Sequence, residues 1–302
     1  MKVKFFMIAT VATMLAACSN DENEINNGPV EARVTAGIDG PATRAIDQNW
    51  SLGNTIGVMV TTAANSDMET LYRNVEYTVG SAGTNGTFTA ESGKGIFFQD
   101  ASETVTFSAY SPYQTSANAA TLPGGTDGTV IGVNTKVQTD QATQETFDYL
   151  FASGATASKD ASTVEFKESY NFKHQMARLI LVLKTSETDG FTAGQVFNGT
   201  YKLGGLKHDG TFKVTDGTAT ASGDAVSDWN ITNNYKEDGN PTGTRTYTMI
   251  LYPQTTSGAL VFSAIIDGQT YTNKDAIYPA LDAGTSYTYT ITMKKTGLTV
   301  SG

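Results

Sequence analysis

Few side chains in this sequence have the type and spacing that catalytic or metal chemistry needs. The 302 residues contain two histidines, His174 and His208, and a single cysteine, Cys18. Neither histidine has a nucleophilic serine motif nearby, and the sequence contains no Gly-x-Ser-x-Gly elbow and no phosphate-binding Gly-x-x-x-x-Gly-Lys-Ser/Thr loop. Zinc would need several histidine, cysteine or carboxylate ligands at close spacing. We therefore expect no catalytic residue, no metal site and no cofactor.

Carboxylates are the remaining candidates for catalysis, because a pair of them can hydrolyse a glycosidic bond. Asp39, Asp140 and Asp148 are as suitable as any other acidic residues, so no pair is singled out. His174 lies between Phe172 and Met176, which favours a partly buried structural imidazole over a general base. The sequence thus predicts that the protein is not an enzyme.

Cys18 has a sequence context that indicates a different chemistry. A basic segment at residues 1–4 and an apolar run at residues 5–14 precede Leu15-Ala16-Ala17-Cys18, and this order is typical of a secretion signal. The apolar run is shorter than the roughly 20 residues that span a membrane. Leu-Ala-Ala-Cys resembles the lipobox of bacterial lipoproteins, so residues 1–17 are predicted to be a lipoprotein signal peptide. The Cys18 sulfur would then carry a diacylglycerol, with palmitate among the acyl chains that anchor the protein firmly.

The residues after Cys18 are acidic and polar. Residues 19–24, Ser-Asn-Asp-Glu-Asn-Glu, include no apolar side chain, which predicts a solvated tether. This segment also resembles the acidic export tag that places some lipoproteins on the outer face of the outer membrane. The formal net charge of the whole chain is −10. Because nucleic acids and anionic lipid head groups bind basic patches, this charge argues against either as a partner.

The segments that would position these residues are predicted to be β-strands. Alternating or short apolar runs predict strands at residues 31–38, 56–60, 105–110, 179–183, 260–266 and 287–294. Residues 179–183 are apolar throughout, which predicts burial on both faces. Asp267-Gly268 follows one run directly and indicates a two-residue hairpin turn. No amphipathic helix longer than about two turns is predicted.

Many short strands separated by turn residues are typical of β-sandwiches. We predict an all-β fold in four parts: a signal peptide at 1–17, a tether with a candidate removable first strand at 18–45, an N-terminal β-sandwich at 46–160 and a C-terminal β-sandwich at 161–302. Residues 222–244 are polar and glycine-rich, which predicts an exposed loop.

Several stretches match one known family in the same order along the chain. They are Thr43-Arg44-Ala45 with Trp50 and residues 53–58, then residues 107–113, Asp140-Gln141 with residues 148–152, residues 172–179 and residues 281–289. On these stretches the chain resembles the fimbrillins, the type V pilin-like surface lipoproteins of anaerobic Gram-negative oral and gut bacteria. The resemblance implies two β-sandwich domains of transthyretin-like Greek-key topology. It also implies a structural subunit or tip component of a cell-surface fimbria, or pilus.

The resemblance further implies how such a subunit is processed. A trypsin-like protease cuts after an arginine and removes the first strand, and a strand of the next subunit fills the groove. The matching cut lies between Arg44 and Ala45 and would release residues 18–44, with Arg33 as the alternative site. An open sheet edge requires a partner strand, and a head-to-tail contact that does not close produces a fibre. The implied partners are therefore other fimbrial subunits, joined by strand exchange.

Two functions stay open at this point. Leu298 and Val300 are the candidate donor or terminal strand, but this strand would be short, which favours a tip subunit with an adhesive role over a stalk subunit. The alternative is a surface lipoprotein that does not polymerise and binds a glycan or a host ligand, with Trp50, Trp229 or tyrosines stacking on sugar rings. Either protein would be exposed on the cell outer membrane, and a fimbrial subunit would enter the fimbrium after processing.

Overall fold

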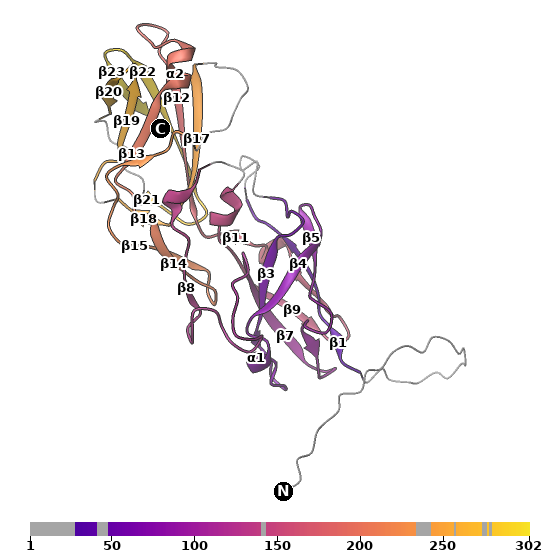
Figure 1. Cartoon of the computed structure of the whole chain (residues 1–302). Helices are drawn as coiled ribbons and strands as arrows, with labels where there is room; N and C mark the ends of the chain where they lie inside the picture. The colour runs from indigo at the N-terminus through magenta and orange to yellow at the C-terminus, as the bar shows by residue number, and fades with distance from the viewer. Residues whose placement is uncertain are drawn as a thin grey trace.

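Strands make up most of the chain in the computed structural model (Figure 1). The structure describes residues 28–40, 48–139, 143–233, 243–256, 258–273, 277 and 280–302. The helices in these residues are short: α1 (Met68–Leu71), α2 (Ala193–Asn198), and the 3-10 turns η1 (Thr135–Val137), η2 (Gln144–Phe147) and η3 (Glu168–Tyr170). No helix in this described part is long and apolar enough to cross a membrane. The predicted all-β fold is confirmed.

One eight-stranded sheet forms the N-terminal unit. Its strands hydrogen-bond in the order β10-β2-β5-β4-β3-β7-β9-β11. Their bounds are β2 (Arg33–Gly37), β3 (Thr55–Thr62), β4 (Val75–Ser81), β5 (Asn85–Thr89), β7 (Thr104–Ser111), β9 (Leu150–Ser158), β10 (Thr163–Phe166) and β11 (Lys173–His174). Neighbouring strands are antiparallel, except that β2 and β10 run parallel. A separate antiparallel pair consists of β1 (Val30–Glu31) and β6 (Phe97–Phe98).

This sheet curls so that one of its faces encloses the core. Successive residues of a strand point to opposite faces, and one buried cluster takes side chains from across the whole sheet, including Phe166 on β10, Val34 on β2, Val58 on β3 and Phe107 on β7. β10 also packs against β9, although the two are not hydrogen-bonded neighbours. The N-terminal unit is therefore a sheet folded back on itself.

The C-terminal unit is a sandwich of two four-stranded sheets with the orders β17-β12-β22-β23 and β16-β13-β19-β20. The first sheet contains β12 (Ala177–Thr185), β17 (Thr244–Leu251), β22 (Ser286–Lys294) and β23 (Gly297–Ser301). The second contains β13 (Thr200–Gly204), β16 (Trp229–Asn230), β19 (Val261–Ile266) and β20 (Gln269–Thr272). Leu181, Phe262 and Ile291 meet in its core. A short pair, β18 (Gln254–Thr255) and β21 (Ala280–Leu281), lies beside them.

Local patterns in this unit were predicted with mixed success. Asp267 and Gly268 both have positive φ, 49° and 78°, and join β19 to β20 as the predicted hairpin turn. The prediction that residues 179–183 are buried on both faces is wrong. Leu179, Leu181 and Leu183 are buried, whereas Ile180 and Val182 are only half-buried, because the second sheet covers one face of β12.

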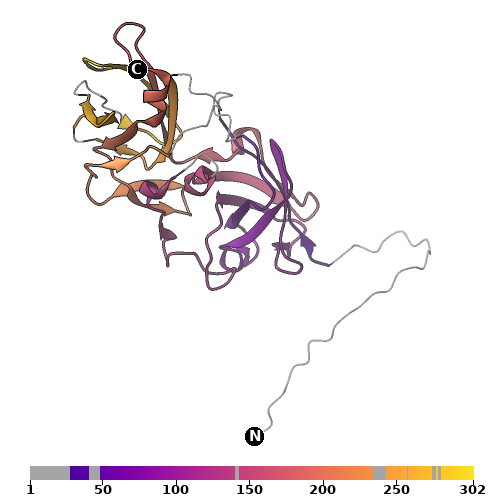
Figure 2. The same ribbon diagram turned by 45° about the horizontal axis from the view of Figure 1, so that its top comes forward.

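A third sheet joins the two units. It has the order β15-β14-β8 and contains β8 (Thr129–Ile131), β14 (Asp209–Lys213) and β15 (Thr218–Ser222). Figures 1 and 2 show the N-terminal strands in indigo and purple and the C-terminal strands in orange and yellow on opposite sides of this junction. Phe212 on β14 stacks on Tyr149, with ring centroids 4.5 Å apart and planes 8° from parallel. The junction is thus a packed apolar cluster that contains residues of both units.

The predicted division after residue 160 can be compared with the strand pairing. β10 pairs with β2, and β11 pairs with β9, so residues 163–166 and 173–174 hydrogen-bond within the N-terminal sheet. The first strand of the C-terminal sandwich, β12, begins at Ala177. The pairing therefore favours a boundary near Gln175 over the predicted one.

His208 lies at the junction and makes stability depend on pH. Its side chain is buried, its Nδ1 is 3.0 Å from the Thr135 hydroxyl, and its ring meets the edge of Trp229 with centroids 4.6 Å apart. Burial, together with the nearby Lys136 charge, lowers the pKa of His208 from 6.5 to about 4. The folded state therefore prefers the neutral imidazole more strongly than the unfolded state does.

We expect His208 to contribute stability above pH 6.5 and to lose it as the pH falls toward 4, by roughly 3 kcal/mol in total. His208→Gln keeps a group that can hydrogen-bond Thr135 but cannot titrate. The measurement is the free energy of unfolding in urea at pH 7.5 and 4.5 for both proteins. The wild type should lose more stability over this interval than the variant, and equal losses would contradict the assignment.

Candidate functional site

Among the described residues of the predicted removable segment, β2 is the strand that lies in the interior of the sheet. It lies between β10 and β5, with Val34 opposite Val164 on one side and Phe88 on the other. Val34 and Ala36 are buried in the core, whereas Arg33 points outward and is exposed. Small apolar side chains on one face and polar ones on the other explain why this segment forms a half-buried strand.

Trp50 holds β2 from the side of the core. Its indole Nε1 donates a hydrogen bond to the Ala36 carbonyl oxygen at 3.0 Å, and its ring makes edge contacts with Phe88 and Phe172 at centroid distances of 5.0 and 5.1 Å. Trp50 is 2% exposed. The backbone of Trp50 also pairs with Gly83 in an isolated bridge. Trp50 therefore links β2 to the rest of the N-terminal core.

The suggestion that tryptophans stack on sugar rings at the surface is wrong for both residues. Trp229 is also 2% exposed, and its Nε1 donates to the Lys136 carbonyl oxygen. Trp229 belongs to β16 within the predicted loop at 222–244, so part of that segment packs into the C-terminal core; residues 234–242 lie outside the described residues. Because each tryptophan is only 2% exposed, neither ring can lie flat against a sugar at the surface.

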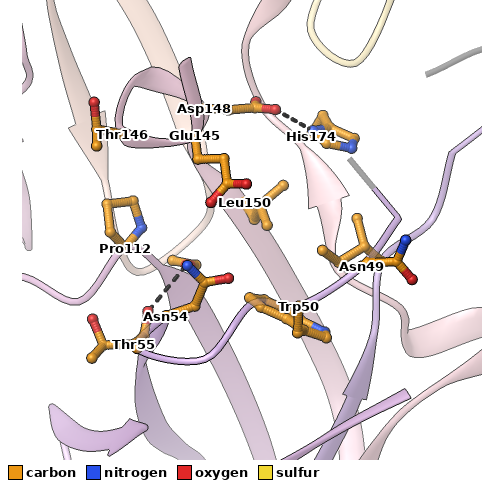
Figure 3. Close-up of a pocket in the computed structure, with 13 residues that line it drawn as sticks. Asn49, Trp50, Asn54, Thr55, Pro112, Glu145, Thr146, Asp148, Leu150 and His174 are labelled. Carbon is orange, nitrogen blue, oxygen red and sulfur yellow. Dashed lines mark hydrogen bonds and ion pairs between the residues drawn. The ribbon is translucent and has the colours of Figure 1, made fainter. Parts of the chain in front are cut away.

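A pocket of ≈ 250 Å³ opens at the end of β2 that is nearest Ile38 (Figure 3). Its apolar lining comes from Ile38, Trp50, Pro112 and Leu150. Its polar lining consists of Asn49, Asn54, Thr55, Ser111, Glu145, Thr146, Asp148 and His174. Figure 3 shows the Glu145 side chain extending from η2 into the pocket, on the side of Asn54.

A histidine–aspartate pair forms one wall of this pocket. His174 Nδ1 and Asp148 Oδ2 are 2.6 Å apart, and their side chains are 3% and 11% exposed. His174 is buried rather than partly buried, and its pairing with Asp148 fixes β11 to the chain segment that leads into β9. Asp148 was one of three interchangeable carboxylates in the sequence. Asp39 lines a neighbouring hollow with His174 and Lys173, whereas Asp140 lies outside the described residues.

The other predicted site residues fall in different places. Cys18, Arg44 and Ala45 lie outside the described residues. Arg33, the alternative cleavage site, is the first residue of β2. Leu298 and Val300 belong to β23, which pairs with β22 of the same chain; Leu298 is buried in the C-terminal core. In the described part of the chain, no three His, Cys, Asp or Glu side chains are grouped as a metal site requires.

Comparisons with known proteins agree with one another. The sequence profile of a family described as fimbrillin-like matches residues 43–302. The chain is 30% identical to Fim1C, a candidate fimbrium subunit of Bacteroides uniformis, over 315 aligned positions that cover all of this chain and 94% of the relative.

Two solved structures have a similar fold. A candidate cell adhesion protein of Bacteroides ovatus superposes with a TM-score of 0.72 at 23% identity, covering 91% of this chain and 96% of that one. A second, from Bacteroides uniformis, has a TM-score of 0.68 at 24% identity, with 92% and 97% covered. At these identities the similarity establishes the fold alone.

Proposed function

Because this chain belongs to the fimbrillin-like family, we propose that it is a subunit of a cell-surface fimbria, as a stalk or tip component, that exchanges β2 for a strand of a neighbouring subunit. The observation that supports this most directly is the place of β2. It comes from the segment before the proposed cut at Arg44-Ala45, yet it is an interior strand of the eight-stranded sheet. The role is structural, and we expect no catalytic step in it.

Loss of β2 would create a groove that only another strand can fill. β5 and β10 would each present a row of unpaired N–H and C=O groups, and the side chains under Val34 and Ala36 would be exposed to water. A donated strand would restore both the hydrogen bonds and the apolar contacts. The folded chain is therefore complete before the cut and incomplete after it.

The groove also restricts which strand can enter. The native inward positions carry Ala32, Val34 and Ala36, all small or medium apolar residues. At Gly37, a Cβ atom would lie 2.7 Å from the Asn171 Oδ1 atom, which is too close for an ordinary contact. A donor strand therefore needs small apolar side chains at the positions of Ala32, Val34 and Ala36. At the position of Gly37, directly after them, it needs glycine or a shift of the Asn171 side chain.

Export and anchoring complete the proposal. Residues 1–17 direct secretion, and lipid on Cys18 holds the precursor on the outer membrane. A cut after Arg44 separates this anchor from the folded units and frees the subunit to join a fimbria. The names of the relatives, a candidate fimbrium subunit and candidate cell adhesion proteins, support a role in surface attachment.

Strand β23 decides between a stalk and a tip role in this scheme. It lies at the edge of its sheet and pairs with β22 alone. To act as a donor it would have to leave β22 and withdraw Leu298 from the C-terminal core. A chain that keeps β23 in place accepts a strand without donating one, which is the behaviour of a tip subunit.

Limited trypsin digestion of residues 19–302 tests the proposal. We expect one early cut after Arg44, identified by N-terminal sequencing, followed by release of the β2 fragment and by oligomers in size-exclusion chromatography. Arg44→Gln should prevent this, whereas Arg33→Gln should not. Fibres of the cut protein alone indicate a stalk subunit, and monomers that bind an added strand peptide indicate a tip. A cut protein that keeps its fragment and stays monomeric would contradict strand exchange and favour the non-polymerising ligand binder.

A further inference from the structure

The pocket beside Ile38 combines an apolar floor with one uncompensated negative charge. Trp50, Pro112 and Leu150 supply apolar surface, and Glu145 and Asp148 supply carboxylates. Asp148 is already paired with His174 at 2.6 Å. The Glu145 carboxylate makes no hydrogen bond or ion pair with any described residue, and its side chain extends into the pocket (Figure 3).

Among the described residues that line this pocket, no lysine or arginine offsets the negative charge of Glu145. The described lining contains neither lysine nor arginine. Lys173 lines the neighbouring hollow, together with Asp39. The pocket is therefore electrostatically complementary to a cation, and Glu145 is exposed, so a cation can reach its carboxylate from solvent.

The size of the pocket limits the form of that cation. A volume of ≈ 250 Å³ lies below the roughly 300–1,000 Å³ typical of sites for drug-sized ligands, so it suits a single side chain. Lysine and arginine carry their charge on a methylene stem that packs on apolar surface while the head group reaches a carboxylate. The pocket also opens beside β11, the last strand of the sheet, where a neighbouring polypeptide can approach.

The geometry points to a receptor pocket for a lysine or arginine side chain of a partner polypeptide, with Glu145 as its counter-ion and the apolar floor as the seat of its stem. This site is distinct from the groove of β2, because it is open while β2 is in place. It gives the fimbrial subunit a second contact for a neighbouring chain. Its test uses the uncut protein, so the result does not depend on strand exchange.

The indole N–H signals in a nitrogen–proton NMR spectrum of residues 19–302 provide the readout. The chain has two tryptophans. Trp50 lines the pocket, whereas Trp229 lies in the core of the C-terminal unit and serves as an internal control. Titration with Nα-acetyl-lysine methylamide or Nα-acetyl-arginine methylamide should shift the Trp50 signal in a saturable way and leave Trp229 unchanged.

Comparisons of protein variants and of probe analogues show whether binding depends on the Glu145 charge and on the length of the probe's methylene stem. Glu145→Gln should weaken binding of the lysine probe about 2- to 5-fold, since it removes an ion pair with an exposed carboxylate. Glu187→Gln makes the same charge change at an exposed residue far along the chain, after β12, and should have no effect. The norleucine analogue, which keeps a similar stem without the charge, should bind about 2- to 5-fold more weakly than lysine. The diaminopropionate analogue, whose stem is shorter, should also bind more weakly than lysine.

The alternatives give different outcomes. An unchanged Trp50 signal, equal affinity of Glu145→Gln and wild type, or equal binding of norleucine and lysine would each overturn the proposal. Binding of free pentylamine without binding of the blocked amino acids would overturn the assignment to a polypeptide partner. A loss of the lysine response in 0.5 M NaCl together with the Glu145→Gln effect would support it.

Discussion

Replacing Trp50 with alanine should destabilise the N-terminal unit by about 3–5 kcal/mol, the usual cost of removing a large buried aromatic side chain. The ring is 2% exposed and contacts Phe88 and Phe172, so truncation leaves a cavity in the core. The variant also leaves the Ala36 carbonyl oxygen without its indole donor. We expect the midpoint of urea unfolding to fall and backbone amides of β2 to exchange faster with solvent.

Trp50→Phe is the matched control for this prediction. Phenylalanine keeps much of the ring contact but cannot donate to Ala36, so the loss should be smaller, with about 0.5–1.5 kcal/mol from the missing hydrogen bond. If strand exchange operates as proposed, the cut Trp50→Ala protein should also release its β2 fragment faster than the cut wild type. A free energy of unfolding for Trp50→Ala within about 0.5 kcal/mol of the wild type would contradict the role of Trp50 in holding β2.

The strands themselves were accessible from the sequence because their patterns are local. Alternation in residues 287–294 and the Asp267-Gly268 turn depend on neighbours a few residues away, and both occur as predicted. Whether residues 179–183 are buried on one face or on both could not be predicted in this way. It depends on how many layers cover the sheet, and here the second sheet packs against one face of β12.

The surroundings of β2 and the pocket beside it could not be predicted, because they depend on pairing between strands that are far apart in the sequence. β2 is held by β10, a parallel neighbour more than a hundred residues later in the chain, and this contact turns a candidate first strand into an interior one. The Asp148–His174 pair requires β9 and β11 to lie side by side. Among the equivalent carboxylates in the sequence, Asp148 differs in standing two residues before Leu150, the first residue of β9, which pairs with His174. The burial of Trp50 likewise depends on distant partners, because it packs against Phe88 and Phe172 and bonds to Ala36 on β2.

The junction between the two units explains why a change in one strand can affect both. Gln138, between η1 and η2, exchanges two hydrogen bonds with the backbone of Ile250 on β17, and the Tyr252 hydroxyl donates to the Val133 carbonyl oxygen at 2.8 Å. These contacts surround the stacked pair of Phe212 and Tyr149. Apolar packing and satisfied polar groups at the same place indicate a rigid connection rather than a flexible one.

Replacing Phe212 with alanine should therefore do more than lower stability. Phe212 is fully buried and stacks on Tyr149, and its ring centroid lies 6.2 Å from that of Tyr110. Its removal should therefore lower the free energy of unfolding by about 3–5 kcal/mol. Because the cavity lies between the units, we expect calorimetric unfolding to separate into two transitions, one for each unit.

Phe166→Ala provides the comparison, since Phe166 is equally buried but lies within the N-terminal core alone. That variant should reduce the free energy of unfolding by a similar amount, and so lower the unfolding temperature of the N-terminal unit. It removes no contact at the junction. Phe212→Ala should separate the transitions more than Phe166→Ala does. If the two variants give the same calorimetric profile, the Phe212 cluster contributes local packing only, and the units are coupled through the hydrogen bonds of Gln138 and Tyr252 instead.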